Sequence, residues 1–301
     1  MKPNREVLCV KTTDTTNGMV EVHALSPAKD YQTFDLHAIT ALAESDAGNF
    51  DFAFAYRNGS YDLVCLKKAK TTNGFLEVHI LSAPDYDTFF LHAETPLKLD
   101  NADDFVFRVA QNKYYGSYDL FCLKKNHTDS HFFEVHILDG SKNFQEYALH
   151  STTILTEQDA SANFDFQVAD YNGDGKADIF CLKTPPGGQF EVHVLDGQKH
   201  YQEYALHTGT PISAADAAQN FQFGVADYDA DYLPDVLGFK RTDTEGSFEL
   251  HLLSQRTKYH EFFYQAPTVI TAQDATNFIF LPVPDYIPFL VYNDTADTAT
   301  A

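Results

Sequence analysis

The sequence contains one pattern of segments five times in succession. The tripeptide Glu-(Val/Leu)-His begins at positions 21, 77, 134, 191 and 249, so successive copies are 56, 57, 57 and 58 residues apart. Each copy is surrounded by the same segments, from an Asn-Phe-x-Phe start to a Tyr-Gln-x-Phe/Tyr-x-Leu-His run. Such a repeat indicates a chain built from copies of one supersecondary unit. The fold therefore follows from the structure of the unit and from how the units close.

Each unit consists of four short segments rich in Val, Ile, Phe and Tyr and bounded by Gly, Asn, Asp or Pro, which is typical of β-strands. In the fourth unit these segments are 164–169, 178–183, 190–195 and 201–207, and they leave no room for a helix. The sequence predicts an all-β fold, a β-propeller of five four-stranded blades, with a solenoid as the competitor. The chain is then a single domain, 1–301, whose repeats are approximately 1–48, 49–102, 103–162, 163–219 and 220–276, with 277–293 closing the ring.

The termini predict how the ring closes. Glu6–Thr12 matches the second strand of a unit and Phe278–Val283 matches a first strand, so the last strand is expected to complete the first blade. This arrangement removes open sheet edges. Ile287–Asn293 also matches a second strand and competes for the place of Glu6–Thr12. A ring of six blades, one of them partial, is therefore the alternative.

The charge and hydropathy of the chain limit its partners. There are 21 Lys and Arg against 43 Asp and Glu, a formal net charge of −22, which argues against binding to nucleic acid. No segment has the 18 or more apolar residues of a membrane span, so no membrane insertion is expected. Sequons at Asn58, Asn126 and Asn293 are compatible with secretion, and an extracellular location is favoured over a cytoplasmic one without being decided. The sequence leaves open whether the protein forms a homo-oligomer.

Four cysteines occupy one position of the repeat. They are Cys9, Cys65, Cys122 and Cys181, and the fifth copy has Gly238 there. Equivalent positions of successive blades are displaced around a ring, so the thiols are not expected to meet. We predict small, buried core residues with free thiols.

Nine of the 13 histidines belong to two repeat positions, the Glu-x-His pair and the Leu-His end of the following strand. Glu77 and His79 are two residues apart and share a face of their strand. Pairing of the last two strands of the unit is expected to place Glu77 opposite His92, which would favour a charged imidazole. Three interpretations are open: a structural ladder, sugar contacts through His79, His136 and His193, or a metal or catalytic site.

Two acidic loops join first and second strands. The fourth unit has Asp170, Asn172, Asp174 and Asp178 with Gly175 for the sharp turn, and Lys176 supplies a main-chain carbonyl. The fifth unit has Asp227, Asp229, Asp231 and Asp235, but Tyr232 replaces the glycine. Oxygen ligands at this spacing suit Ca²⁺, and the alternative is an Asx-rich turn without metal. The last Asp of the loop persists as Asp62, Asp119, Asp178 and Asp235, which indicates a turn-holding role as well.

The unit at 163–183, followed by Phe-Glu-Val-His-Val-Leu-Asp-Gly at 190–197, resembles the VCBS/FG-GAP repeat, the blade of integrin-α-type propellers. It is similar in particular to a lectin-type subgroup with Glu-Val-His-Val-Leu-Asp-Gly repeats. The resemblance spans nearly the whole chain and is strongest in 163–207. It implies Ca²⁺ in the loop of Asp170, Asn172, Asp174 and Asp178, and glycan binding instead of chemistry. The Phe-Gly and Gly-Ala-Pro signatures are absent, and most copies lack the cation ligands.

These features predict a lectin, a non-enzymatic protein with several sugar sites that binds glycans or glycoproteins and is partly supported by calcium. Candidate sugar contacts are the aromatics of the last-strand motif and two neighbouring acids, namely Tyr31, Tyr86, Phe144, Tyr201, Tyr259, Asp139 and Asp196. The alternatives are a structural or adhesive propeller that binds proteins, and a five-bladed glycoside hydrolase with a pair of unique acids in its channel. No such pair stands out from the repeats.

Overall fold

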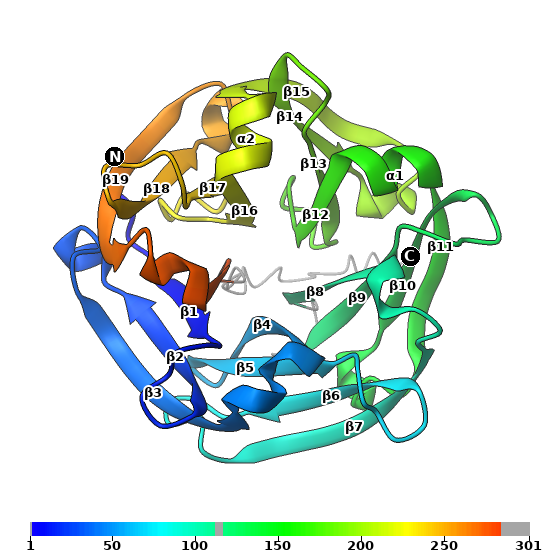
Figure 1. The fold of residues 1–301 in the computed structure, drawn as a ribbon. Helices are drawn as coiled ribbons and strands as arrows, with labels where there is room; N and C mark the ends of the chain where they lie inside the picture. The colour runs from blue at the N-terminus through cyan, green and yellow to red at the C-terminus, as the bar shows by residue number, and fades with distance from the viewer. Residues whose placement is uncertain (1, 112–116, 284–301) are drawn as a thin grey trace, which may run out of the picture.

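The fold is a ring of five four-stranded antiparallel sheets, seen in a computed structural model that describes residues 2–111 and 117–283 (Figure 1). From the centre outward the strands of blades 2 to 5 follow chain order, and blade 1 has the last strand of the chain at the centre, followed by the first three. In blade 1 the order is β20 (Phe278–Leu281), β1 (Val7–Lys11), β2 (Met19–Leu25) and β3 (Phe34–Ala43). In blade 2 it is β4 (Phe50–Arg57), β5 (Ser60–Lys67), β6 (Phe75–Leu81) and β7 (Phe89–Lys98).

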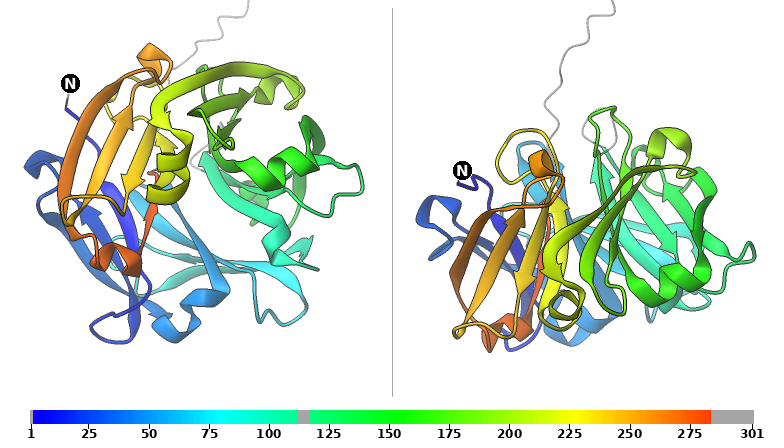
Figure 2. Two further views of the ribbon diagram at one scale, coloured as in Figure 1. Left: turned by 45° about the horizontal axis from the view of Figure 1, so that its top comes forward. Right: turned by 90° about the horizontal axis from the view of Figure 1, so that it is seen from above.

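The other three blades have the same construction. Blade 3 contains β8 (Phe105–Gln111), β9 (Tyr118–Lys124), β10 (Phe132–Leu138) and β11 (Tyr147–Thr156). Blade 4 contains β12 (Phe164–Ala169), β13 (Asp178–Lys183), β14 (Gln189–Leu195) and β15 (Tyr204–Ser213). Blade 5 contains β16 (Phe221–Ala226), β17 (Asp235–Lys240), β18 (Ser247–Leu253) and β19 (Phe262–Thr271). Figure 2 shows the blades from two further sides.

The ring closes as the termini predict. β20 pairs antiparallel with β1 over four residue pairs, from Leu8 opposite Leu281 to Lys11 opposite Phe278. The predicted five-bladed propeller is thus confirmed for the residues that the structure describes. The segment Ile287–Asn293, on which the six-bladed alternative rested, lies outside those residues.

Short helices join the strands, which corrects the expectation that the units have no room for them. The α-helices α1 (Glu157–Asn163) and α2 (Ala214–Asn220) connect blades 3 to 4 and 4 to 5. Each begins after a capping hydroxyl, because Thr156 and Ser213 accept bonds from the amides of Asp159 and Asp216. The 3-10 helices are η1 (Pro27–Lys29), η2 (Glu44–Asn49), η3 (Ala102–Asp104), η4 (Gly140–Lys142), η5 (Gly197–Lys199), η6 (Gln255–Thr257) and η7 (Asp274–Asn277). No helix in the described ranges is both long and apolar enough for a membrane span.

The core consists of five apolar clusters, one between each pair of adjacent blades. Stacked phenylalanines join the third strand of one blade to the inner strand of the next. Their ring centroids are 4.2 Å apart for Phe133 and Phe166, and 3.8 Å apart for Phe248 and Phe280. Complete burial of such a side chain stabilises the fold by about 1.5–3 kcal/mol. Repeated Phe residues therefore hold the blades together.

The four cysteines are buried and free, as predicted. Each lies in an apolar cluster between two blades, and burial raises the pKa of its thiol. Gly238 replaces cysteine in blade 5 because the space there is taken. A Cβ atom on Gly238 would lie 2.9 Å from Cδ1 of Phe221.

Candidate functional site

The repeated histidines meet in pairs across the outer two strands of each blade. In blade 2 the register places His79 opposite His92 and Glu77 opposite Glu94. The predicted pairing of Glu77 with His92 is therefore wrong. A β-bulge accounts for part of the difference, because β7 has one more residue than β6 between the pairs Ile80–Leu91 and Leu81–Phe89. The same shift occurs in all five blades.

The histidine of each Glu-x-His motif bonds to the glutamate two residues before it. The expectation that these two residues share a face of the strand is therefore confirmed. Nε2 of His23, His79, His193 and His251 lies 3.0, 3.1, 2.9 and 3.0 Å from the glutamate Oε2, and in blade 3 the distance from His136 to Glu134 is 3.4 Å. The second histidine is the more exposed of the pair. In blade 4 the side chain of His193 is 3% exposed and that of His207 is 63% exposed.

Burial decides the charge of these pairs. It lowers the pKa of His23, His79, His136 and His193 despite the opposing effect of the glutamates. Burial would raise the pKa of Glu21, but hydrogen bonds from Thr16 and His23 outweigh it and hold this pKa below its usual value. These four histidines are thus neutral at neutral pH. The charged imidazole expected from a pairing of Glu77 with His92 loses its basis, because the two residues do not face each other.

An aromatic side chain that the sequence reasoning missed joins each pair. It is the first residue of the outermost strand, namely Phe34, Phe89, Tyr147, Tyr204 or Phe262. The bulge brings this residue to the face of the histidines, so that the rings of Phe34 and His23 have centroids 5.1 Å apart and those of Tyr147 and His150 3.9 Å. Phe34 and Tyr204 are 38% and 39% exposed. We call the glutamate, the two facing residues and this aromatic of one blade its rim cluster.

The aromatics that the sequence predicted as sugar contacts are core residues. Tyr31, Tyr86, Phe144, Tyr201 and Tyr259 are 1%, 2%, 2%, 3% and 0% exposed, which leaves no ring face for a sugar. Each has a positive φ in the turn before the outermost strand. The hydroxyl of Tyr201 donates to the carbonyl of Ala177 at 3.1 Å and thus ties this turn to the strand behind it. This part of the predicted site is corrected.

The two predicted acids also hold turns. Asp139 accepts a bond from the amide of Ser141 at 2.8 Å, and Asp196 accepts one from Lys199 at 3.2 Å. They cap η4 and η5, the turns that carry the buried aromatics. Both are half-buried. Capping of these turns explains why Asp139 and Asp196 occur at this position of the repeat.

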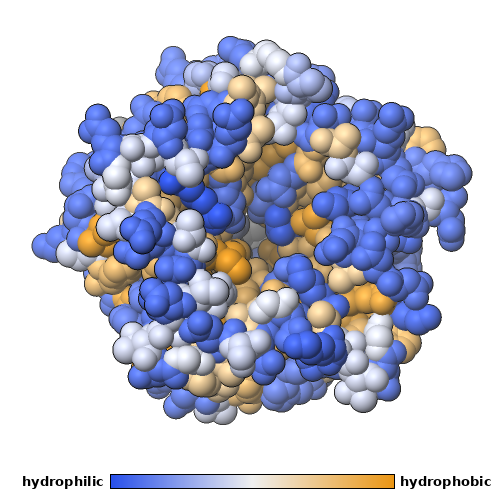
Figure 3. All heavy atoms as spheres, viewed as in Figure 1, coloured by the Kyte–Doolittle hydropathy of each residue, from blue (hydrophilic) through white to orange (hydrophobic). Residues whose placement is uncertain are grey.

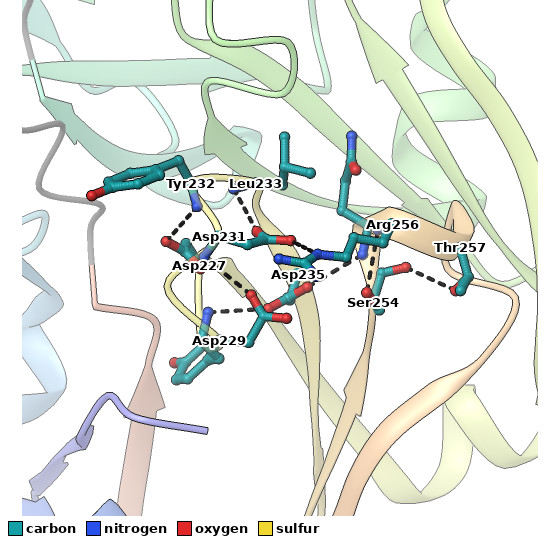
Figure 4. A network of polar contacts seen from close by, with 11 residues as sticks. Asp227, Asp229, Asp231, Tyr232, Leu233, Asp235, Ser254, Arg256 and Thr257 are labelled. Carbon is teal, nitrogen blue, oxygen red and sulfur yellow. Dashed lines mark hydrogen bonds and ion pairs between the residues drawn. The ribbon is translucent and has the colours of Figure 1, made fainter. Parts of the chain in front are cut away.

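The acidic loop of blade 5 brings three carboxylates together (Figure 4). One oxygen each of Asp227, Asp229 and Asp231 lies within 4.8 Å of the others, and Asp227 is 1% exposed. Burial and the neighbouring Asp231 raise the pKa of Asp229. The guanidinium of Arg256 bonds to Asp231 and compensates part of this charge. The donors are the hard oxygens that Ca²⁺ prefers.

The loop of blade 4 has the same backbone pattern. Asp170 accepts bonds from the amides of Gly173 and Gly175, both at 2.8 Å, and Asp174 accepts one from Lys176 at 2.8 Å. In blade 5 the amide of Tyr232, which corresponds to Gly175, donates to Asp227 at 3.0 Å, and the amide of Asp231 donates to the same side chain at 3.1 Å. The loop therefore keeps its shape although Tyr232, with φ of 66°, replaces Gly175, with φ of 81°. Asn172 accepts from Asp174 at 2.9 Å.

The persistent last Asp of the loop holds two turns at once. Asp178 accepts bonds from the amides of Tyr171 and Gly197 at 2.9 and 2.7 Å, and Asp235 accepts from Tyr228 and Gln255 at 3.1 and 3.2 Å. Both are fully buried. Burial raises the pKa of Asp178 to about 7 and that of Asp235 to about 8. The predicted turn-holding role agrees with these bonds.

The inner strands enclose a hollow at the centre of the ring (Figure 3). The cavity there has a volume of about 270 Å³, and Asp51, Arg108, Asp165, Gln167 and Gln222 are among its lining residues. Arg108 bonds to Asp165 at 3.2 Å, and Asp51 bonds to Lys68 at 2.6 Å. Asp51 and Asp165 occupy the same repeat position in blades 2 and 4, and the other three blades have Val106, Gln222 and Ile279 there. The sequence reasoning did not single them out.

A family model described as an FG-GAP-like repeat matches residues 170–238, from the acidic loop of blade 4 to β17 of blade 5. This stretch of the five-bladed β-propeller is thus similar to an FG-GAP-like repeat. None of the curated proteins matches the chain. Among solved structures, the crystal structure of a "putative exo-beta-1,3-galactanase from Bifidobacterium bifidum s17" is 12% identical and covers 84% of this chain and 81% of that chain, with a TM-score of 0.43.

The expectation that the protein is not an enzyme is contradicted by this match, which is to a chain titled a "putative exo-beta-1,3-galactanase". The match covers most of both chains. At this identity and TM-score the match assigns no reaction and no residue to the propeller described here.

Proposed function

We propose that this propeller binds carbohydrate on glycans or glycoproteins through its rim clusters. The observation that carries the proposal is the exposed aromatic ring beside the glutamate and the second histidine. In blade 4, Tyr204 is 39% exposed and the side chains of His207 and Glu191 are 63% and 29% exposed. An aromatic face with adjacent hydrogen-bonding groups is the usual composition of a sugar site.

The repetition of the cluster supports a lectin-like mode of binding. Each blade presents an aromatic, a glutamate and a facing pair, which is His–His in four blades and His251 with Gln265 in blade 5. Sites on one rigid ring that engage the same glycan surface raise the overall affinity without any new contact. Weak single sites are sufficient for such a protein.

We also propose that Ca²⁺ binds the acidic loop of blade 5, and more weakly that of blade 4. Asp227, Asp229 and Asp231 would hold the ion in blade 5, where their oxygens converge and burial raises the pKa of Asp229. In blade 4 the ligands would be Asp170, Asn172, Asp174 and the carbonyl of Lys176. The ion would neutralise buried carboxylates and rigidify the loops between first and second strands.

A glycan array with the full chain, with and without EDTA, tests the binding proposal. The variant Tyr204→Ala with Phe34→Ala removes the two most exposed rim aromatics and is expected to weaken array binding. Tyr232→Ala is the matched control, because Tyr232 is 69% exposed and lies outside the rim clusters. Equal binding by wild type and the rim variant would contradict the proposal.

A glycoside hydrolase is the second candidate, favoured by two acids of the channel that the other three blades lack. Asp51 and Asp165 line one cavity, and hydrolysis of a glycosidic bond requires two carboxylates at such a place. The protein would then release reducing sugar from a panel of polysaccharides, and Asp51→Asn or Asp165→Asn would abolish the release. Rim variants would leave that activity unchanged.

A further inference from the structure

The glutamate and both histidines of blade 1 converge on one point. Oε2 of Glu21 lies 3.0 Å from Nε2 of His23 and 3.4 Å from Nε2 of His37. One possible ligand atom of each of the three residues lies within 4.8 Å of the other two. Donor atoms bound to Zn²⁺ at about 2.0–2.1 Å at the corners of a tetrahedron are about 3.3 Å apart. The two distances from the carboxylate thus match the edges of a zinc coordination tetrahedron.

From this convergence we infer that Glu21, His23 and His37 form a binding site for a divalent transition metal ion of the Zn²⁺ type. Two imidazole nitrogens and one carboxylate oxygen are a common ligand set for zinc sites that keep a fourth position for water or substrate. Glu21 and His23 are 1% and 5% exposed, whereas the side chain of His37 is 54% exposed. The open fourth position therefore faces solvent at the rim of the blade.

The surroundings of Glu21 support this assignment. Its second oxygen, Oε1, accepts a bond from the amide of Thr16 at 3.0 Å, which fixes the carboxylate and leaves Oε2 to the imidazoles. Lys11 is the cross-strand neighbour of Glu21. Its ammonium group donates a hydrogen bond to the carbonyl of Asp14 and therefore does not occupy the proposed metal site.

Blade 4 has a looser version of the same site. Oε2 of Glu191 lies 2.9 Å from Nε2 of His193 and 4.0 Å from Nε2 of His207. Nζ of Lys183 is 3.8 Å from the same oxygen, and its positive charge competes with a metal ion. We expect blade 4 to bind the ion more weakly than blade 1.

The remaining blades provide internal controls. In blade 2 the imidazole of His79 lies between Glu77 and His92. Its Nε2 bonds to Glu77 at 3.1 Å, and its Nδ1 faces Nδ1 of His92 at 2.5 Å. The donor of His92 is therefore on the far side of the ring from the carboxylate. Blade 3 has the same arrangement with Nδ1 atoms 2.7 Å apart, and in blade 5 the bridging His251 meets the amide of Gln265. The clusters of blades 2, 3 and 5 thus resemble that of blade 1 in composition, but their donor atoms do not converge on one point.

The inference does not rest on carbohydrate binding and is tested without any sugar. Zn²⁺ is titrated into the full chain, prepared without a histidine tag and freed of metal, and binding is followed by calorimetry. We expect one tight equivalent for blade 1 and a weaker second one for blade 4. The variant His37→Gln, which copies the residue of blade 5, should raise the dissociation constant of the tight equivalent by about 100-fold or more, because even loss of an outer-shell partner costs about 10–100-fold.

His92→Gln is the matched control, since it makes the same change in a cluster that does not converge. It should leave both equivalents unchanged. Co²⁺ added to the wild-type protein should give the visible absorption of a tetrahedral site, a readout that needs no variant. Absence of saturable Zn²⁺ binding, or equal weakening by His37→Gln and His92→Gln, would overturn the inference. Neither result would bear on sugar binding, which the glycan array measures separately.

Discussion

The buried carboxyl of Asp235 gives the sharpest prediction on stability, through the change Asp235→Asn. This side chain is 0% exposed and accepts two backbone amides, and Asp229 and Asp231 lie nearby. Burial raises its pKa to about 8 from an ordinary value near 4. A carboxyl whose folded pKa is raised stabilises the fold at low pH, and this stability is lost as the pH rises from about 4 to about 8.

The magnitude follows from the two pKa values. Their difference corresponds to roughly 5 kcal/mol of lost stability above pH 8 in the absence of a bound cation. Asparagine stays neutral but offers one acceptor oxygen in place of two, and an unsatisfied buried amide costs about 1–3 kcal/mol. At pH 9 the variant should therefore be more stable than wild type by about 2–4 kcal/mol. At pH 5 wild type has lost only about 1.5 kcal/mol, so the two proteins should be nearly equal.

Urea unfolding of both proteins in EDTA at pH 5 and pH 9 measures this difference. Asp62→Asn is the contrasting variant, because Asp62 is 2% exposed and bonds to the guanidinium of Arg57. Loss of that ion pair should destabilise the protein at both pH values. A variant Asp235→Asn that is less stable than wild type at pH 9 would refute the reasoning, since it would mean that the amide bonds to Asp235 outweigh its burial.

Three further predictions concern the loops and the core. Tyr232→Gly should stabilise the protein by about 1 kcal/mol and raise the melting temperature by about 2 °C, because Tyr232 has φ of 66° and is mostly exposed; a lower melting temperature would contradict this. Phe280→Ala removes the stacking of the closing strand on Phe248 and should cost about 3–5 kcal/mol in urea unfolding, and a loss below about 1 kcal/mol would argue against closure by β20. Cys181 should react with a thiol reagent only after unfolding, and rapid labelling of the native protein would contradict its burial.

The repeat was sufficient to predict the fold. A period of about 57 residues with four apolar segments determined the number of blades, and the match of Phe278–Val283 to a first strand predicted the closure that β20 makes with β1. The linking helices α1 and α2 were missed because each is only seven residues long. Their capping residues Thr156 and Ser213 are the signal that could have located them.

The site was predicted less well, because its geometry depends on a β-bulge. A strand with strict alternation would place Tyr204 and His207 on opposite faces, since they are three residues apart. The bulge in β15 puts both on one face, so the exposed aromatic is Tyr204 and the buried one is Tyr201. The conserved spacing alone could not distinguish these two tyrosines. The Asn or Asp residues before Tyr31, Tyr86 and Phe144, and the turn they predict, are the signal that these aromatics belong to a tight turn.

The central claim is that sugar binds at the rim of the blades. A crystal structure of the protein soaked with the best ligand from the glycan array tests it most directly. The account predicts a sugar ring against an exposed rim aromatic such as Tyr204, within hydrogen-bond distance of His207 or Glu191. A sugar in the central channel beside Asp51 and Asp165, with the rim clusters free of it, would contradict the claim.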